Sequence, residues 1–281
     1  MRILVSGSSG FIGSELVSLL RKKGNEVVCF SRDSTYSHEQ LEGFNAVVHL
    51  AGENIVARWT KRKMRNILLS RTVGTRSIAE LLSQTTKPPA LFISPSAIGY
   101  YGNRGEEELT EESLSGVGFL SEVCRSWESS ASPLAQRGCR IVHPRFGMVL
   151  GKGGLLQRLI PLTKWGLGGI LGSGNQWVSW VSLRDALAAI EFALHEPRIT
   201  GAYNVVAPGV VRQKEFAQSL AAHLRRKVGP AFPPWFMHLI VGSMADELLL
   251  ASTKVRATKL EQFNFAFRDD SLDKALKFAL K

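Results

Sequence analysis

The chain has 281 residues, of which 44% are hydrophobic and 21% are charged, and its formal net charge is +11. This composition fits one large α/β domain, or a main domain with a small addition, that buries a substantial core. No run approaches the roughly 18 apolar residues that cross a bilayer, and the chain begins with a strand-like segment in place of a signal peptide. We therefore expect a cytoplasmic protein with no membrane partner.

The cysteines argue against a metal or redox-dithiol site, and the distribution of basic residues argues against nucleic-acid binding. Cys29, Cys124 and Cys139 lie far apart and lack the paired spacings of zinc sites or redox dithiols, so we expect reduced thiols and no metal. The lysines and arginines are spread along the chain, and the densest cluster is Lys61–Lys63 with Arg65. This cluster is either a solvated helix face or a site that attracts phosphorylated ligands. No nucleic-acid partner is expected, because no recognised binding module accompanies the charge.

In chain order, uniformly apolar runs alternate with helix-like stretches. The predicted strands are Arg2–Ser6, Glu26–Phe30, Ala46–Leu50, Ala90–Ser94 and Arg140–Pro144. Runs of this kind are too apolar for half-exposed antiparallel strands. The pattern predicts an α/β fold with a doubly wound parallel sheet, the Rossmann type, and a smaller C-terminal substrate or lid region.

After Arg145 the pattern becomes irregular and rich in glycine through Gly174. A helix is predicted over Leu183–His195, a strand over Ala202–Val206 and a helix over Gln213–Arg226, before prolines at 230, 233 and 234 interrupt the chain. We expect residues 1–230 to form an NAD(P)-binding, epimerase-like Rossmann domain with substrate-side insertions from about residue 146. Residues 231–281 would form a helical C-terminal module packed on it.

The first turn has the spacing of a dinucleotide-binding turn, because it follows the first strand and opens a helix. Gly7 would permit the tight turn, Gly10 would let backbone N–H groups approach a pyrophosphate, and Gly13 would let the helix pack closely on the strand. The residues predicted here to contact the cofactor are Gly7, Ser9, Gly10, Phe11, Ile12 and Gly13.

The end of the second strand predicts which cofactor is bound. Ser31 and Arg32 precede Asp33 at the place where an acidic residue would bind the ribose 2′-hydroxyl of NAD. The Arg32 guanidinium suits the 2′-phosphate of NADP, and Ser31 can donate to the same group. We expect NADP(H). Asp33 would favour NAD if the strand ended one residue later.

Small residues follow the third strand, where the cofactor would pass. Leu50, Ala51 and Gly52 bring little bulk to the carboxyl edge of the sheet, whereas the neighbouring His49 is interpreted as a core histidine. Ser94 and Pro144, which end the fourth and fifth predicted strands, are also assigned to cofactor binding.

Over nearly its whole length the sequence resembles the atypical extended short-chain dehydrogenases described as epimerase-family proteins. The matching motifs are Gly7–Gly13, Leu50–Ile55, Ser70-Arg71, Ser96–Gly102, Trp127-Glu128, Val149–Gly151, Gly166–Gly174 with Gln176-Trp177, and Ala207-Pro208. The tail from about Trp235 resembles the short C-terminal module of that group. The resemblance implies bound NADP(H), with Ser31, Arg32, Leu50, Ala51 and Arg71 in cofactor-contacting segments.

The usual catalytic pair of the wider superfamily is missing. There, a tyrosine four residues before a lysine on one helix transfers a proton, and the lysine lowers the pKa of the tyrosine. When the helix is aligned on Glu128, Leu120 and Cys124 occupy those two positions. No tyrosine elsewhere in the chain precedes a lysine by four residues.

Other groups are candidates for the chemistry. Ser96 matches the catalytic serine of the superfamily, although it could instead satisfy local backbone groups. Tyr100 and Tyr101 would leave the fourth strand at the mouth of the cleft, and either could supply a proton, with Tyr100 taken as the candidate. Arg145 is expected to line the substrate half of the cleft. The acidic residues 106–108 and 111–112 are interpreted as a solvated flap.

These features predict an NADP(H)-binding, epimerase/dehydratase-like oxidoreductase that lacks the tyrosine–lysine pair. Its small-molecule substrate is unidentified, with a nucleotide sugar or a carbonyl compound as candidates. The alternative is a regulatory or redox-sensing protein that binds NADPH without turnover. A homodimer is left open as the assembly.

Overall fold

A computed structural model of the chain describes residues 1–30 and 37–281, so Ser31 and Arg32 lie outside the described residues. Its main sheet has the order β11-β7-β4-β3-β1-β2, with the short strand β5 paired to β7. The strands are β1 (Arg2–Ser6), β2 (Glu26–Phe30), β3 (Ala46–His49), β4 (Leu91–Ile93), β5 (Ser96–Ala97), β7 (Arg140–Phe146) and β11 (Gly201–Val205). All their pairings are parallel.

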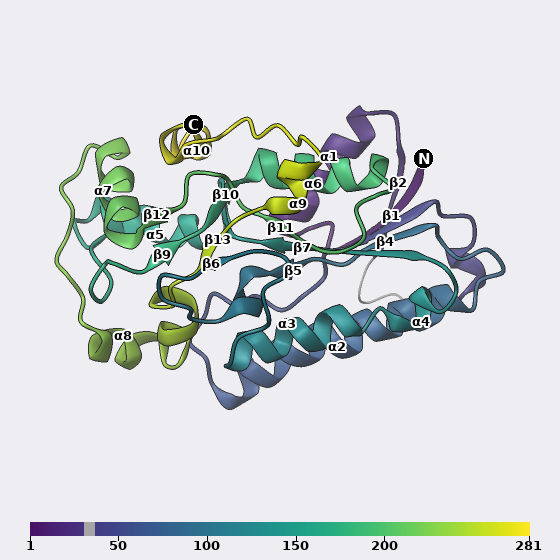
Figure 1. Cartoon of the computed structure of the whole chain (residues 1–281), viewed down its shortest axis with the longest axis horizontal. Helices are drawn as coiled ribbons and strands as arrows, with labels where there is room; N and C mark the ends of the chain where they lie inside the picture. The colour runs from purple at the N-terminus through teal and green to yellow at the C-terminus, as the bar shows by residue number, and fades with distance from the viewer. Residues whose placement is uncertain (31–36) are drawn as a thin grey trace.

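Helices cover both faces of this sheet (Figure 1). On one face lie α1 (Phe11–Lys22) and α6 (Leu183–His195), and on the other lie α2 (Lys61–Ser83), α3 (Phe119–Ser129) and α4 (Ser132–Ala135). Alternate residues of each strand enter the two cores: Ile3 and Val5 pack on the α1–α6 side, and Leu4 packs on the α2 side. Both faces need apolar residues, which is why the strands are uniformly hydrophobic.

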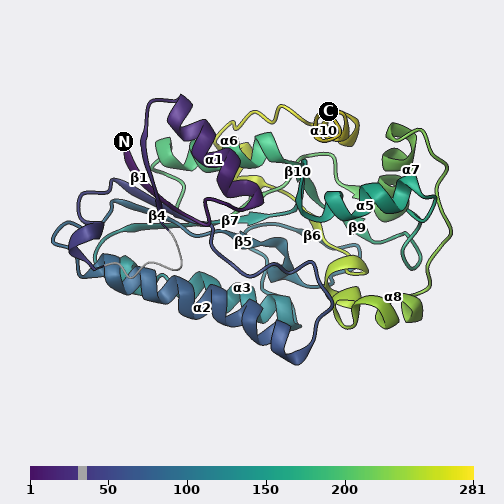
Figure 2. The ribbon, with the colours of Figure 1, turned by 180° about the vertical axis from the view of Figure 1, so that it is seen from behind.

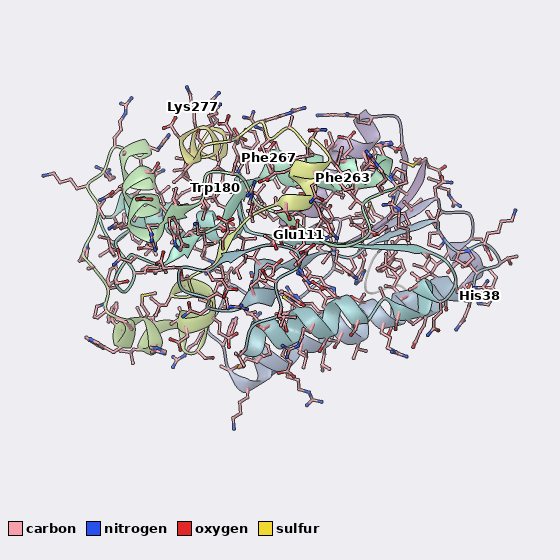
Figure 3. All side chains as sticks on the ribbon, in the orientation of Figure 1. His38, Glu111, Trp180, Phe263, Phe267 and Lys277 are labelled. Atoms are coloured by element: carbon pink, nitrogen blue, oxygen red, sulfur yellow. The ribbon has the colours of Figure 1, made fainter. Side chains whose placement is uncertain are left out.

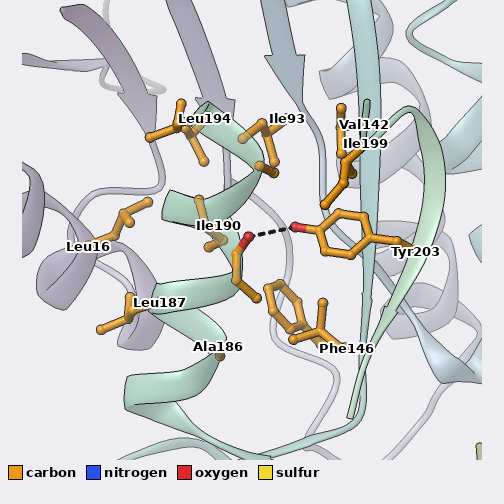
Figure 4. Close-up of a cluster of buried hydrophobic side chains, with 14 of the residues drawn as sticks. Leu16, Ile93, Val142, Phe146, Ala186, Leu187, Ile190, Leu194, Ile199 and Tyr203 are labelled. Atoms are coloured by element: carbon orange, nitrogen blue, oxygen red, sulfur yellow. Dashed lines mark hydrogen bonds between the residues drawn. The ribbon is translucent and has the colours of Figure 1, made fainter. Parts of the chain in front are cut away.

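The core on the α1–α6 side is closed by aliphatic side chains around one tyrosine (Figure 4). Leu16 of α1 and Ile190 of α6 pack in this cluster, and Tyr203 of β11 reaches in from the sheet. The Tyr203 hydroxyl, fully buried, donates to the carbonyl oxygen of Ala189 at 3.1 Å, so no polar atom of this side chain is left unsatisfied.

The predicted Rossmann architecture is confirmed, but the prediction of irregular structure between residues 146 and 174 was wrong. That stretch contains β8 (Met148–Leu150) and α5 (Gly154–Lys164). Glycines at the start of α5 and Pro161 within it obscure the helical pattern in the sequence. The helix forms because tertiary burial of Leu156 stabilises it where local propensity does not.

The remaining elements form a cap at the carboxyl end of the sheet, and three small sheets tie it together. Strand β10 (Trp180–Ser182) pairs with β8, β12 (Val211–Arg212) with β9 (Trp177–Val178), and β13 (Lys254–Val255) with β6 (Glu108–Leu109). The helices here are α7 (Gln213–His223), α8 (Pro234–Val241) and α10 (Leu272–Ala279), with a π-helical turn, η3 (Ala245–Leu249). Helix α9 (Thr258–Gln262) instead packs against β11, where Nζ of Lys259 donates to the Ala202 carbonyl oxygen at 2.7 Å.

Figure 2 shows the cap from behind, with α5, α7 and α8 gathered at the end of the molecule away from the N-terminus. Within the described residues, no helix combines the length and apolar character needed to cross a membrane.

Candidate functional site

The glycine turn between β1 and α1 is built so that only glycine fits. Gly7 has φ +67°, and a Cβ atom there would lie 2.7 Å from the backbone nitrogen of Ala51. A Cβ atom on Gly13 would lie 2.1 Å from the Gly7 carbonyl oxygen. Gly10 begins α1 without a side-chain cap, and the first turn carries no acidic residue. The first N–H groups of α1 are therefore available to an anionic ligand.

A buried serine and histidine position the neighbouring loop. The Ser6 hydroxyl accepts from the Ala51 N–H at 3.3 Å and forms a 2.7 Å hydrogen bond with Nδ1 of His49. Burial lowers the pKa of His49 to about 4, so the imidazole is neutral at physiological pH. His49 is thus a core residue that contacts Ser6, and Ser6 is the residue that bonds to Ala51.

Arg71 reaches this loop from α2. Its Nη1 donates to the Glu53 carbonyl oxygen at 3.0 Å, and its guanidinium lies 4.9 Å from the Trp127 ring centroid. A Cβ atom on Gly52 would already meet the Arg71 guanidinium at 3.4 Å. Burial lowers the pKa of Arg71, an effect that the nearby Cys124 and Glu53 oppose. The arginine therefore brings a partly desolvated positive charge to the segment assigned to the cofactor.

Helix α3 carries Leu120 and Cys124, the two residues that the sequence alignment sets at the expected positions of the catalytic pair. Leu120 packs against Gly99, and a Cβ on that glycine would lie 3.1 Å from Cβ of Leu120. The Cys124 thiol donates to the Ala97 carbonyl oxygen at 3.7 Å. Burial raises the pKa of Cys124 to about 11, so the thiol is protonated at neutral pH and is not a nucleophile.

Ser96 lies beside this thiol on β5. Only 2% of its surface is exposed, and its hydroxyl has no hydrogen bond of ordinary geometry among the described residues, although it interacts weakly with the Cys124 thiol. The hydroxyl of Ser94 is also buried without such a partner. The two serines place hydroxyl groups without an ordinary hydrogen bond just after β4 and at the start of β5.

The two adjacent tyrosines have different environments. Tyr101 is fully buried, donates to Oδ1 of Asn204 at 2.7 Å and accepts from Nη1 of Arg145 at 3.0 Å. Burial raises the pKa of Tyr101 to about 12, which makes it a poor proton donor. Tyr100 is half-buried, and the guanidinium carbon of Arg145 lies 3.4 Å from its ring centroid. Of the two, Tyr100 is the one that a ligand can reach.

The expectation that Arg145 lines the cleft was wrong. Its side chain is 4% exposed and forms two 2.8 Å hydrogen bonds to the Glu128 carboxylate. Burial lowers the pKa of Arg145, but the bonds to Glu128 outweigh it, and the net shift is upward. Arg145 thus anchors α3 to β7. The sequence contained no signal for this pairing beyond the presence of the two residues.

A cavity of about 320 Å³ opens beside the glycine turn. Ser9, Gly10 and Phe11 form one wall, and Lys152 and Gly153 form the other. The loop at the start of α5 must approach closely, because a Cβ on Gly153 would lie 2.4 Å from the Phe11 ring. Phe11 therefore positions the substrate-side loop in addition to starting α1.

The acidic segment is solvated as expected, because Glu106–Glu108 and Glu112 are exposed, but it is held at both ends and is not a free flap. Glu106 binds Arg212 and accepts from Nε1 of Trp177 at 2.9 Å. Glu111 lies between the sheet and α9 (Figure 3), where it accepts from the backbone N–H groups of Asn204 and Lys259 at 2.9 and 3.2 Å. In the part of the chain that the structure describes, no three histidine, cysteine or acidic side chains are grouped to hold a metal ion.

Comparison with known proteins gives the context of these features. Residues 3–206 match the NAD dependent epimerase/dehydratase family, and residues 232–279 match a domain of unknown function, DUF1731. The chain is similar to Epimerase family protein Mb2239 of Mycobacterium bovis, with 33% identity covering 99% of this chain and 97% of the relative. It is 32% identical to Epimerase family protein YfhF of Bacillus subtilis, over 100% of this chain and 97% of the relative.

A solved structure is similar over the same extent. It is the crystal structure of human epimerase family protein SDR39U1 (isoform 2) with NADPH, which has a TM-score of 0.93 and 30% sequence identity, covering 100% of both chains.

Proposed function

The chain belongs to the NAD-dependent epimerase/dehydratase family, and from this premise we propose that it binds NADP(H) and acts as an oxidoreductase of the epimerase/dehydratase type. The observation that carries the proposal is the glycine turn, whose geometry leaves the N-terminus of α1 open to a pyrophosphate. The full-length similarity to a protein solved with NADPH supports the choice of cofactor.

The residues present fit such a cofactor. Gly7 and Gly13 leave room that any Cβ atom would fill, and Ala51 and Gly52 keep the adjacent loop small. Arg71 brings a positive charge to the same loop, and the buried Ser94 hydroxyl is free of a regular partner. When bound, the cofactor supplies hydride transfer, so the protein needs to bind, orient and exchange a proton.

We assign the proton transfer to Tyr100 and keep Ser96 as the second candidate. Tyr100 is half-buried, and Arg145 fixes one face of its ring. Ser96 is kept because its hydroxyl, buried beside Cys124 at the start of β5, has no ordinary hydrogen bond. A nucleotide sugar or a carbonyl compound is the candidate substrate, because both carry an oxygen that gains or loses a proton during hydride transfer.

A second function is favoured by α3. Leu120 and Cys124 cannot transfer a proton or lower the pKa of a tyrosine, so the chain could hold NADPH as a regulatory or redox-sensing protein without turnover.

The first experiment compares NADPH and NADH by fluorescence titration. We expect tighter binding of NADPH, because Arg32 can pair with the 2′-phosphate. Arg32→Ala should weaken NADPH binding and leave NADH binding nearly unchanged. Tighter binding of NADH by the wild type would exclude NADP as the cofactor.

The second experiment follows turnover with a panel of carbonyl compounds and sugar nucleotides, using nicotinamide absorbance and product mass. A redox-neutral epimerisation changes only the second readout. Tyr100→Phe should lower kcat by about 10²-fold or more with cofactor affinity unchanged, because it removes only the transferable proton. Unchanged kcat in this variant would exclude Tyr100, and tight NADPH binding without any product would favour the sensor.

A further inference from the structure

Exposed apolar side chains gather on two segments of the cap. They are Leu162, Trp165 and Leu167 at the end of α5, and Trp235, Leu239 and Ile240 on α8. Their exposed fractions range from 41% for Leu162 to 78% for Trp165. We refer to these six residues as the α5–α8 surface. Several large apolar side chains exposed on neighbouring segments are a sign of an interaction site.

The two segments are held together by backbone hydrogen bonds. The Gly229 N–H donates to the Gly168 carbonyl at 2.8 Å, and the Phe232 N–H donates to the Ile170 carbonyl at 2.8 Å. The approach is so close that a Cβ atom on Gly169 would lie 1.8 Å from the Pro230 carbonyl oxygen. Both ribbon views place α5 and α8 at the same end of the molecule (Figures 1 and 2).

Basic residues border this surface on two sides. One group lies beside α5 and before α8. The other lies at the start of α2, next to the end of α8, because the Trp59 N–H donates to the Val241 carbonyl at 3.4 Å. The first group is Lys164, Arg225, Arg226 and Lys227, and the second is Arg58, Lys61, Arg62 and Arg65. All eight are exposed, and none forms an ion pair with another residue of 1–30 or 37–281.

The acidic residues nearest to α8 are already engaged. Oδ1 of Asp246 lies 3.0 Å from Nε2 of His238, a contact that is an ion pair only when the histidine is protonated, and the Glu247 carboxylate accepts from the backbone N–H groups of Phe119 and Leu120. The rim of the surface is therefore positive.

The cations at the start of α2 also oppose the helix dipole. Lys61 and Arg62 occupy the first turn of a 23-residue helix that has no acidic residue there. The partial positive charge of a helix N-terminus makes cations unfavourable at this position. A partner that carries negative charge would offset this cost.

We propose that the α5–α8 surface lies on an anionic phospholipid bilayer, with its apolar side chains among the headgroups and the two basic groups on the anionic lipids. Tryptophan and leucine bordered by lysine and arginine are the side chains that interfacial helices use. A second copy of the chain fits less well, because a two-fold contact would bring the basic groups against each other. This differs from the expectation of no membrane partner, which considered only segments long enough to cross a bilayer.

The test is co-sedimentation of the full chain with vesicles of phosphatidylcholine alone or mixed with phosphatidylglycerol. Binding is expected only to the mixed vesicles, with a loss of about tenfold or more at about 0.5 M salt. Trp235→Ser with Leu239→Ser should lower the partition coefficient about tenfold or more, because these side chains supply the apolar contact. Leu114→Ser with Val117→Ser, which are 80% and 92% exposed outside the surface, is the matched control and should leave binding unchanged.

A charge variant separates binding from folding. Lys61→Glu with Arg62→Glu places acidic residues in the first turn of α2, so its melting temperature should be equal or higher while vesicle binding falls about tenfold or more. Absence of binding to the mixed vesicles would overturn the proposal. So would an equal loss in the control variant. If polyglutamate displaces the protein from the vesicles and the apolar substitutions have no effect on binding, the α5–α8 surface binds an acidic protein instead.

Discussion

At the scale of single residues, buried polar groups determine what each side chain can do. Tyr101 and Tyr100 are neighbours in the sequence, yet only Tyr101 is bonded to Asn204 and Arg145. His49 shows the same effect, because its burial keeps the imidazole neutral while Nδ1 bonds to the Ser6 hydroxyl. The identity of a residue sets its possible chemistry, and its surroundings select one protonation state.

His49 makes stability depend on pH. Its pKa is about 4 in the folded protein and 6.5 in the unfolded chain, so between these values the unfolded chain binds more protons. The contribution to the free energy of unfolding is fully present above pH 6.5 and is lost as the pH falls towards 4, by about 3 kcal/mol at most.

Urea unfolding at several pH values measures this slope. His49→Gln, whose amide can still bond to Ser6, should show a smaller fall in the free energy of unfolding between pH 6.5 and 4. The same slope in wild type and variant would show that other groups cause the acid destabilisation.

At the scale of elements, close backbone approach explains the glycines that matter. The turn before α1 and the start of α5 both bring backbone to within contact of a neighbouring segment. Gly13 meets the Gly7 carbonyl, and Gly153 meets the Phe11 ring. In contrast, Gly74 on α2 has no atom within 4 Å of its Cβ position. A glycine in the sequence therefore has no single meaning, and its neighbours decide it.

We expect opposite effects from two glycine-to-alanine changes. Gly13→Ala should destabilise the protein by about 1–3 kcal/mol and weaken NADPH binding, because the new methyl group forces the turn apart. Gly74→Ala should stabilise it by about 0.5–1 kcal/mol, because alanine has less backbone freedom to lose in a helix. Thermal unfolding with and without NADPH checks both. A stable Gly13→Ala with wild-type cofactor affinity would contradict the role of the turn.

At the scale of the whole molecule, the C-terminal segment is part of the core structure. Strand β13 pairs with β6, and α10 packs on α7 and β10 through Leu276, Phe216 and Trp180. Glu247 caps α3 from more than a hundred residues away in the sequence. These contacts couple the cap to the helix beside the proposed site.

Because of this coupling, calorimetry should show one unfolding transition that NADPH moves to higher temperature. A ligand at 100 times its dissociation constant stabilises a folded protein by about 2.7 kcal/mol. Glu247→Gln should lower the transition temperature and keep a single transition. Two transitions in the wild type, of which only one responds to NADPH, would show that the segments unfold independently.

The strands and the glycine turn were predictable from the sequence, because each depends on short-range spacing. Runs of apolar residues suffice for buried parallel strands. The replacement of the tyrosine–lysine pair by Leu120 and Cys124 stays a prediction from the sequence alignment. The assignment of NADP rests on Arg32, outside the described residues, and stays a prediction.

Only the tertiary structure decided which polar groups are buried and what they contact. Arg145 pairs with Glu128, Tyr101 with Asn204 and Glu111 with the backbone of Lys259, over separations of 17, 103 and 148 residues. The apolar α5–α8 surface likewise joins two segments that are distant in the chain. The local sequence pattern shows which face of a helix or strand is apolar. The residues that this face contacts come from distant chain segments, which meet only in the folded molecule.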